Sequence, residues 1–205
     1  MYSLSDEPTG RQSWIDERRD AAVATFAAKI PGIYQVDIEL DPGIARWAAG
    51  ESNCPSLFIT GPLGVGKTHS AWQAIHRWVY SQFGANYRGT PVVESWRSTA
   101  LFDALRPDTD GNSGRALVKR LQQVDLLYID DLAAARPSSW TQERLFEIFD
   151  DRYINRRPVL ITSDVLPKEL LEVTGERVLS RLAEMCRGGV VHIEGADRRR
   201  GVAAA

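Results

Sequence analysis

The sequence has few cysteines and no long hydrophobic run. Only Cys54 and Cys186 occur in 205 residues, far apart and without the spacing of metal ligands, which is typical of a protein from a reducing compartment. No stretch approaches the roughly 20 consecutive apolar residues that a membrane span requires. The N-terminus also lacks the apolar run of a signal peptide, so we predict a cytoplasmic protein with no membrane partner.

An excess of charge of one sign is also missing. The formal net charge is −2, which excludes bulk attraction to nucleic acid, so any contact with DNA must come from a local basic patch. Hydrophobic residues make up 43% and charged residues 25% of the chain, as in ordinary globular proteins. The length allows one α/β domain with a sizeable core and a short appendage.

Apolar strands alternate with helical patterns through most of the chain. The predicted strands span residues 56–60, 91–95, 125–130, 158–162 and 189–193. The predicted helices span residues 67–83, 98–105, 115–124, 140–153, 168–173 and 176–185. Ser139, with Gln142 three residues on, is the expected cap of the helix at 140–153. The alternation indicates an α/β fold with a parallel five-stranded sheet and helices on both faces.

The segment before the first strand is predicted to be an appendage. Residues 1–12 are polar and form an expected tail. Ser13 is the predicted cap of a helix that runs to about Lys29, before Pro31-Gly32. Its apolar stripe is modest, so the helix either packs on the main domain or docks a partner, and we favour packing. We divide the chain into this segment, residues 1–50, and a main domain, residues 51–205.

A phosphate-binding loop follows the first strand. It matches G-x-x-x-x-G-K-[ST] in full and reads Gly61-Pro62-Leu63-Gly64-Val65-Gly66-Lys67-Thr68. Glycines let successive backbone N–H groups turn toward an anion, and the following helix directs its positive end at the same point. The motif lies between an apolar strand and an amphipathic helix, which is the context it requires, so a chance Gly-rich loop is disfavoured.

The loop predicts ATP and Mg²⁺ as ligands. Lys67 is expected to reach the β- and γ-phosphates, and the Thr68 hydroxyl is expected to bind Mg²⁺. The residues assigned to the cofactor are Gly61, Pro62, Leu63, Gly64, Val65, Gly66, Lys67, Thr68 and the adjoining His69.

Two acids end the third predicted strand. Asp130 and Asp131 follow the apolar run Leu126–Ile129, and ligands of a parallel sheet sit at the carboxyl ends of its strands. Asp130 is therefore expected to hold Mg²⁺ together with Thr68. Asp131 is expected to orient or deprotonate the attacking water. A turn aspartate is the alternative interpretation of such a pair, but its position some sixty residues after the loop favours the functional one.

Two later segments carry candidate polar groups. The strand at 158–162 runs into Thr162, Ser163 and Asp164, which either sense the γ-phosphate or simply cap a turn. Arg177 and Arg181 lie at i and i+4 on one helix face. They either pair with surface acids or reach the γ-phosphate of a neighbouring subunit. From these residues alone, the turn cap and the solvated helix face are favoured.

Taken together, these segments resemble the AAA+ ATPases of the DnaC and IstB group, the helicase loaders and transposition helpers. The resemblance runs from about Pro55 to Arg199 and rests on several motifs in order. They are GPLGVGKTH, VDLLYIDDLA, RYINRRP feeding VLITSD, and GERVLSRLAEM. The first two motifs are shared by many P-loop proteins, whereas the later ones, at these spacings, are more specific. The resemblance implies an AAA+ ATPase domain over residues 51–205 without a C-terminal lid domain.

The resemblance also implies roles for particular residues. Lys67 and Thr68 match the nucleotide ligands of the family, and Asp130 with Asp131 its acidic pair. Asp164 matches the sensor position, which is usually Asn in the loaders, so the Asp is more similar to the related DnaA initiators. Arg181 matches the family's arginine finger, which acts in trans, with Arg177 as a helper.

Contact with single-stranded DNA is a further expectation. Basic residues flank the helices between the second strand and the acidic strand, where the resemblance places a single-strand path. They are Arg106, Arg115, Lys119 and Arg120. Trp96 or Phe102 would supply an aromatic platform for bases. An ordinary solvated helix face is the equal alternative.

The leading functional hypothesis is an assembly switch in DNA replication. ATP binding would order a homo-oligomer on a replicative helicase or single-stranded DNA, and hydrolysis would release it. A transposition helper that binds duplex DNA beside a transposase is the close alternative. A small-molecule P-loop kinase is disfavoured because no arginine-rich lid is evident, and a binding module without turnover is disfavoured by the intact acids. The sequence does not predict which residues contact adenine.

Overall fold

A computed structural model describes residues 10–83, 89–106 and 113–197 of the chain. Five strands form one sheet in the order β2-β3-β4-β1-β5. Their bounds are Leu57–Thr60 (β1), Val93–Arg97 (β2), Leu126–Asp130 (β3), Val159–Ser163 (β4) and Val190–His192 (β5). Every pairing is parallel, which confirms the predicted five-stranded parallel sheet.

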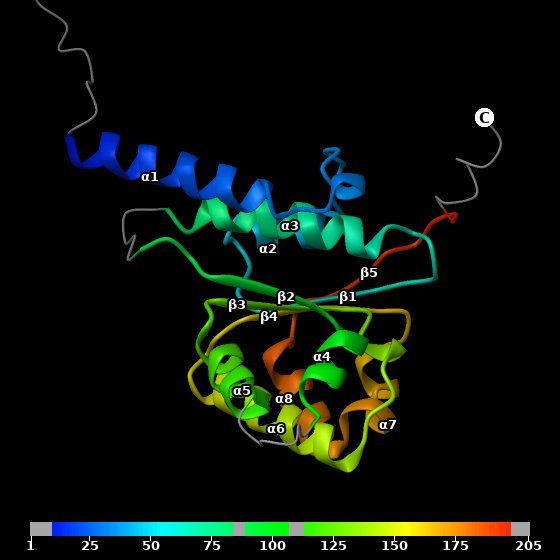
Figure 1. The fold of residues 1–205 in the computed structure, drawn as a ribbon. Coiled ribbons are helices and arrows are strands. Elements are labelled where there is room, and N and C mark those ends of the chain that lie inside the picture. The colour runs from blue at the N-terminus through cyan, green and yellow to red at the C-terminus, as the bar shows by residue number, and fades with distance from the viewer. Residues whose placement is uncertain (1–9, 84–88, 107–112, 198–205) are drawn as a thin grey trace, which may run out of the picture.

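Helices cover both faces of the sheet (Figure 1). One face carries Gly10–Ala27 (α1), Pro42–Ala48 (α2) and Lys67–Ser81 (α3). The other carries Ser98–Ala104 (α4), Ser113–Gln123 (α5), Ser139–Ile154 (α6), Leu171–Thr174 (α7) and Glu176–Met185 (α8). Short 3₁₀ turns lie at Gly32–Tyr34 (η1), Leu132–Ala134 (η2) and Pro167–Glu169 (η3). No helix in these described ranges is long and apolar enough to cross a bilayer.

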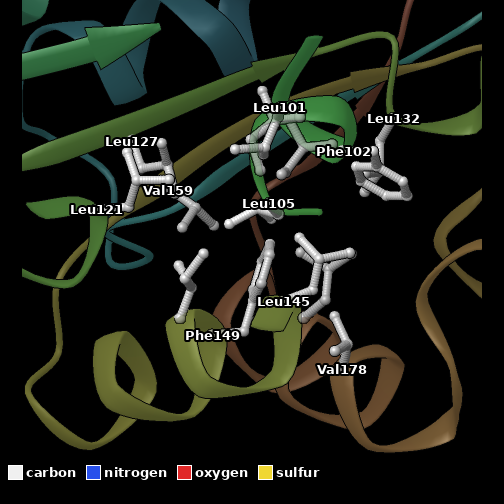
Figure 2. Close-up of a cluster of buried hydrophobic side chains, with 14 of the residues drawn as sticks. Leu101, Phe102, Leu105, Leu121, Leu127, Leu132, Leu145, Phe149, Val159 and Val178 are labelled. Carbon is white, nitrogen blue, oxygen red and sulfur yellow. The ribbon is translucent and has the colours of Figure 1, made fainter. Parts of the chain in front are cut away.

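The central strands separate two apolar cores because successive side chains point to opposite faces. In β3, Leu126 and Tyr128 join the core under α1, α2 and α3, whereas Leu127 and Ile129 join the other. Figure 2 shows this second core, in which Phe149 of α6 faces Leu105 beneath the sheet. The central strands β1, β3 and β4 are buried almost throughout, as the continuous apolar runs predict.

The N-terminal helix packs against α3, as favoured from the sequence. Ile15, Ala22 and Phe26 are buried, and the Phe26 ring lies 6.1 Å from the ring of Trp72. Helix α1 begins at Gly10, three residues before the expected cap Ser13, so that cap assignment is wrong. Part of the predicted tail, residues 1–9, lies outside the described residues.

Three local features differ from the sequence expectations. Helix α6 is capped by Ser138 rather than Ser139, because Thr141 completes a reciprocal capping box with Ser138. The predicted helix at 168–173 divides into η3 and α7, since Pro167 opens a separate turn. Helix α2 was not predicted, although Pro42 is favourable in a first helical turn and the Asp41 carboxylate accepts from the Gly43 N–H at 2.7 Å.

Candidate nucleotide-binding site

The phosphate-binding loop joins β1 to α3 at the carboxyl edge of the sheet. Gly64 and Gly66 have φ values of 84° and 102°, which residues with a Cβ rarely adopt. Gly66 caps α3, so the free N–H groups of the first helical turn open into the loop. A Cβ on Gly61 would lie 2.2 Å from the carbonyl oxygen of Ile193. The loop therefore needs glycine both for its backbone conformation and for its contact with the segment after β5.

Lys67 lies across its own loop. Its Nζ donates to the carbonyl oxygens of Gly61 at 2.8 Å and Pro62 at 2.9 Å. Val65 points into the protein and is buried, whereas Leu63 is exposed. The loop thus contributes backbone groups and the lysine ammonium to the site, and Val65 serves packing.

Thr68 and Asp130 meet as the sequence predicts. The Thr68 hydroxyl donates to Asp130 Oδ1 at 2.9 Å. Two further hydroxyls donate to the same oxygen, from Tyr128 at 2.7 Å and from Thr162 at 2.7 Å. The contact arises because β3 and the start of α3 lie at the same edge of the sheet, 62 residues apart in sequence.

Asp131 is held in an unusual backbone conformation. Its φ is 55°, in the left-handed region, which costs about 1 kcal/mol for a residue with a Cβ. Its N–H donates to the Thr162 hydroxyl at 2.8 Å, and its carbonyl accepts from the Ser98 hydroxyl. Both backbone groups of Asp131 are therefore fixed by neighbouring elements, and this determines the position from which its carboxyl group extends.

Asp131 and Asp164 form a pair of carboxyls beside the loop. Burial, a hydrogen bond with Asp164 and the charges of Asp164 and Asp130 together raise the pKa of Asp131 to about 6, while the charge of Lys67 opposes the rise. This proximity follows from the strand order, because β4 lies between β3 and β1. The pair can therefore hold a proton near neutral pH.

One cavity of about 790 Å³ joins these groups. Its lining includes most of the residues that the sequence assigned to the site, namely Leu63, Gly64, Gly66, Lys67, Thr68, His69, Asp130, Asp131 and Asp164. The other lining residues come from four places: the segment around η1, the junction of β2 with α4, the η2 turn after β3, and the tip of β4. They are Ile33, Tyr34, Arg97, Ser98, Thr99, Ala134 and Thr162. The cavity volume suits a nucleotide, which is a ligand of ordinary pocket size.

The N-terminal part of the cavity was missed by sequence reasoning. Residues 34–38 lie along α3, where His69 Nε2 contacts the Val36 carbonyl at 2.7 Å and Gln73 donates to the Tyr34 carbonyl at 2.7 Å. One turn further, Arg77 pairs with Asp37 at 2.8 Å. The three helix residues recur every four positions and so share one face. The spacing of these three polar residues is visible in the sequence, but the sequence does not show that residues 34–38 lie against them.

Arg177 and Arg181 do not line this cavity within the chain. The Arg181 guanidinium pairs with Asp150 at 2.8 Å and lies 4.7 Å from the ring centre of Tyr153. Arg177 lies over the Phe146 ring at 3.4 Å. Both side chains are thus held on the surface formed by α6 and α8. A role at phosphate requires a second chain and remains a prediction.

The proposed aromatic platform for DNA is partly wrong. Phe102 is buried in the core, at 2% exposure, because it faces inward from α4, and Trp96 donates its ring N–H to Glu94. Arg120 also pairs with Glu94, at 2.8 Å, and Arg106 pairs with Asp103. Arg115 and Lys119 are exposed. The final arginines of the closing motif, from residue 198 on, lie outside the described residues.

The geometry of the site fits a nucleoside triphosphate with a bound divalent ion. The Thr68 hydroxyl gives its only proton to Asp130, so its lone pairs are free for a cation. Carboxylate and hydroxyl oxygens are the ligands that Mg²⁺ prefers. The cavity beside the Lys67 ammonium and the loop backbone has room for an anion. Mg²⁺ at this place would neutralise phosphate charge.

Comparisons with known proteins support this assignment. Residues 35–188 match the family described as the bacterial DnaA ATPase domain. The phage-like element PBSX protein XkdC of Bacillus subtilis (strain 168) is 29% identical over 150 residues, 69% of this chain and 51% of that protein. The chromosomal replication initiator protein DnaA of Mycoplasma genitalium is 34% identical over 141 residues, 69% of this chain and 31% of that protein. The chain spans about half or less of the length of these curated relatives.

Solved structures share the fold. A replication initiator DnaA bound to AMPPCP and single-stranded DNA has a TM-score of 0.57 at 27% identity, over 75% of this chain and 45% of that one. A DnaC helicase loader has a TM-score of 0.55 at 19% identity, over 94% of this chain and 95% of that one. The latter likeness shows the fold alone.

Fold and site together define a P-loop ATPase domain of the AAA+ class. The family match covers most of the chain. The chain therefore belongs to the bacterial DnaA ATPase domain family.

Proposed function

We propose that this chain binds ATP with Mg²⁺ and hydrolyses it. The observation that carries this proposal is the contact of the Thr68 hydroxyl with Asp130 Oδ1 at 2.9 Å, beside the Lys67 ammonium. In this assignment Lys67 binds the β- and γ-phosphates, and Thr68 with Asp130 holds Mg²⁺. Asp131 orients or deprotonates the water, and Asp164 lies beside it as the sensor. The bound AMPPCP of the DnaA relative supports the choice of ATP.

Lys67→Ala tests nucleotide binding. We expect the affinity for ATP in Mg²⁺ to fall by at least about a hundredfold, because the change removes the cation at the centre of the loop. Isothermal titration calorimetry measures the change, with Lys29→Ala as a control that removes an exposed lysine outside the cavity lining. Unchanged affinity in Lys67→Ala would refute the phosphate assignment.

Hydrolysis is proposed to need a second chain. Arg181 does not reach the cavity of its own chain and is held on the surface by Asp150, so it is available to the site of a neighbour in an ATP-dependent homo-oligomer. Arg177, one turn earlier on α8, would assist it. Arg181→Ala should therefore retain ATP affinity and lose turnover, whereas Arg187→Ala, which removes another exposed arginine near the end of the same helix, should retain both.

Mixing variants separates action in trans from action in cis. Lys67→Ala and Arg181→Ala should each lack ATPase activity alone. In a mixed oligomer, the intact loop of one variant meets the intact arginine of the other, so part of the activity should return. If the mixture stays inactive while both variants still assemble, the trans assignment of Arg181 is wrong.

The wider role that we propose is loading or remodelling of a replicative helicase on single-stranded DNA. The DnaA relatives and the fold shared with a DnaC helicase loader favour this role over the transposition helper. A pull-down with purified replicative helicase and purified transposase, each with ATP or ADP, distinguishes the two. ATP-dependent capture of the helicase is expected, and capture of the transposase alone would favour the alternative.

A further inference from the structure

Asp130 receives more hydrogen bonds than a strand-end aspartate needs. Hydroxyls of Thr68, Tyr128 and Thr162 all donate to its Oδ1, at 2.9, 2.7 and 2.7 Å. Each carboxylate oxygen has about two lone-pair sites, so three donors saturate this oxygen. The carboxylate is therefore fixed from the strand side as well as from the loop side.

The directions of these hydrogen bonds are determined by the surrounding partners. The Thr162 hydroxyl accepts from the Asp131 N–H at 2.8 Å, so its own proton is directed to Asp130. Tyr128 is buried, and its hydroxyl lies 2.7 Å from a carboxylate oxygen that can only accept, so the tyrosine is the donor. Thr68 lines the cavity, and because its proton is given to Oδ1, its lone pairs are left to accept from or bind a ligand there.

Tyr128 reaches Asp130 because of its place in the sheet. The two residues are separated by one position in β3 and so point to the same face, under α3. The Tyr128 ring is 1% exposed and meets Trp72 of α3 edge-on, with 5.5 Å between ring centres and an interplanar angle of 89°. Packing therefore fixes the ring, and the ring fixes the hydroxyl.

We propose that Tyr128 is a positioning residue for the Mg²⁺ site: its hydroxyl, with that of Thr162, holds Asp130 in the orientation that presents Thr68 to the metal. This inference rests on the proposed function, since it assigns Mg²⁺ to Thr68 and Asp130. Groups that orient a metal ligand typically change metal affinity by about 10- to 100-fold when they are removed. Tyr128 is not among the residues that line the cavity, and its hydroxyl acts through Asp130.

The test compares ATP binding with and without the metal. In calorimetry, ATP affinity is measured in Mg²⁺ and in EDTA, and the ratio reports the metal contribution. Tyr128→Phe keeps the ring against Trp72 and removes one hydroxyl. We expect the ratio to fall by about tenfold, with the affinity in EDTA unchanged. Tyr80→Phe, an exposed tyrosine of α3, is the matched control and should keep the wild-type ratio.

A merely structural role of Tyr128 predicts a different result. It would lower the melting temperature and weaken binding equally in Mg²⁺ and EDTA, so the ratio would stay at its wild-type value and the proposal would be overturned. A double-mutant cycle adds a second criterion. In an Asp130→Asn background, Tyr128→Phe should have no further effect on the ratio, and a full effect there would also overturn the proposal.

Two measurements keep the outcome clear. Thr162→Val removes another donor to the same oxygen and is expected to lower the ratio in the same direction, so the proposal can be tested even if Tyr128→Phe does not fold. An unchanged ratio in whichever of these variants folds would overturn it. If the wild-type protein itself binds ATP equally in Mg²⁺ and EDTA, the metal assignment under the proposed function fails as well, which separates the two failures.

Discussion

The carboxyl pair beside the loop makes the stability of the nucleotide-free protein depend on pH. The folded chain raises the pKa of Asp131 from 3.8 to about 6, so the folded state binds this proton more tightly than the unfolded state. The associated stability is fully present below the unfolded pKa and is lost as the pH rises through the folded pKa. The free energy of unfolding should therefore fall between about pH 4 and pH 6 through this group.

Asp131→Asn removes the titrating carboxyl group and keeps a side chain of nearly the same shape. Taken in full, a pKa rise from 3.8 to about 6 corresponds to about 3 kcal/mol. Because the carboxyl is partly exposed, solvent screens its interactions, and we expect about 1 kcal/mol. The variant should thus gain about 1 kcal/mol over wild type at pH 7.5, relative to their difference at pH 4. Asn also tolerates the left-handed backbone at this position, which adds a constant offset rather than a slope.

Urea unfolding followed by tryptophan fluorescence measures this difference. The free energies of unfolding of wild type and Asp131→Asn are compared at several values between pH 4 and pH 7.5, in EDTA and without nucleotide. Titrating groups that do not interact with Asp131 cancel in the difference. Glu17→Gln, an exposed acid of α1, should follow the wild-type profile. A difference that stays constant with pH, or that favours wild type as the pH rises, would refute the reasoning.

Two further predictions concern the framework of the site. Gly61→Ala should lower the free energy of unfolding by about 2 kcal/mol or more and weaken ATP binding, because its Cβ would lie 2.2 Å from the Ile193 carbonyl oxygen at a φ of +150°. Urea unfolding and calorimetry measure the two effects. Gly10→Ala is the control, because nothing lies within 4 Å of its Cβ, and it should leave both quantities unchanged. Arg152→Met should cost about 3 kcal/mol in urea unfolding, since it removes the hydrogen bonds that the buried guanidinium donates to four backbone carbonyls. A loss below 1 kcal/mol would contradict that account.

Local motifs made the meeting of the loop with Asp130 predictable. Lys67 and Thr68 belong to one contiguous loop, and Asp130 ends an apolar strand whose carboxyl edge faces that loop in any parallel sheet. Each step needs only a short stretch of sequence and one rule of topology. The five strands followed from the alternation of apolar runs with helical patterns for the same reason.

Contacts between distant segments could not be predicted in this way. The pairing of Asp131 with Asp164 depends on β4 lying next to β3, and the sequence left its neighbour open between two strands. One local contact was also not predicted: Ser138 rather than Ser139 caps α6, because Ser138 forms reciprocal hydrogen bonds with Thr141. Phe102 read as an exposed aromatic, although α4 turns it into the core.

The division of the chain at residue 50, made from the sequence, separates residues 33–38 from the domain that holds the rest of the cavity. Ile33 and Tyr34 line the nucleotide cavity, and the family match begins at residue 35. His69, Gln73 and Arg77 hold the backbone and side chains of this segment from one face of α3. Because the same helix begins at Lys67, the phosphate loop and this segment are attached to a single rigid element. A ligand that contacts both the phosphate-binding loop and Tyr34 would therefore lie between two walls of the cavity. Helix α3 sets the distance between these walls, because both are attached to it.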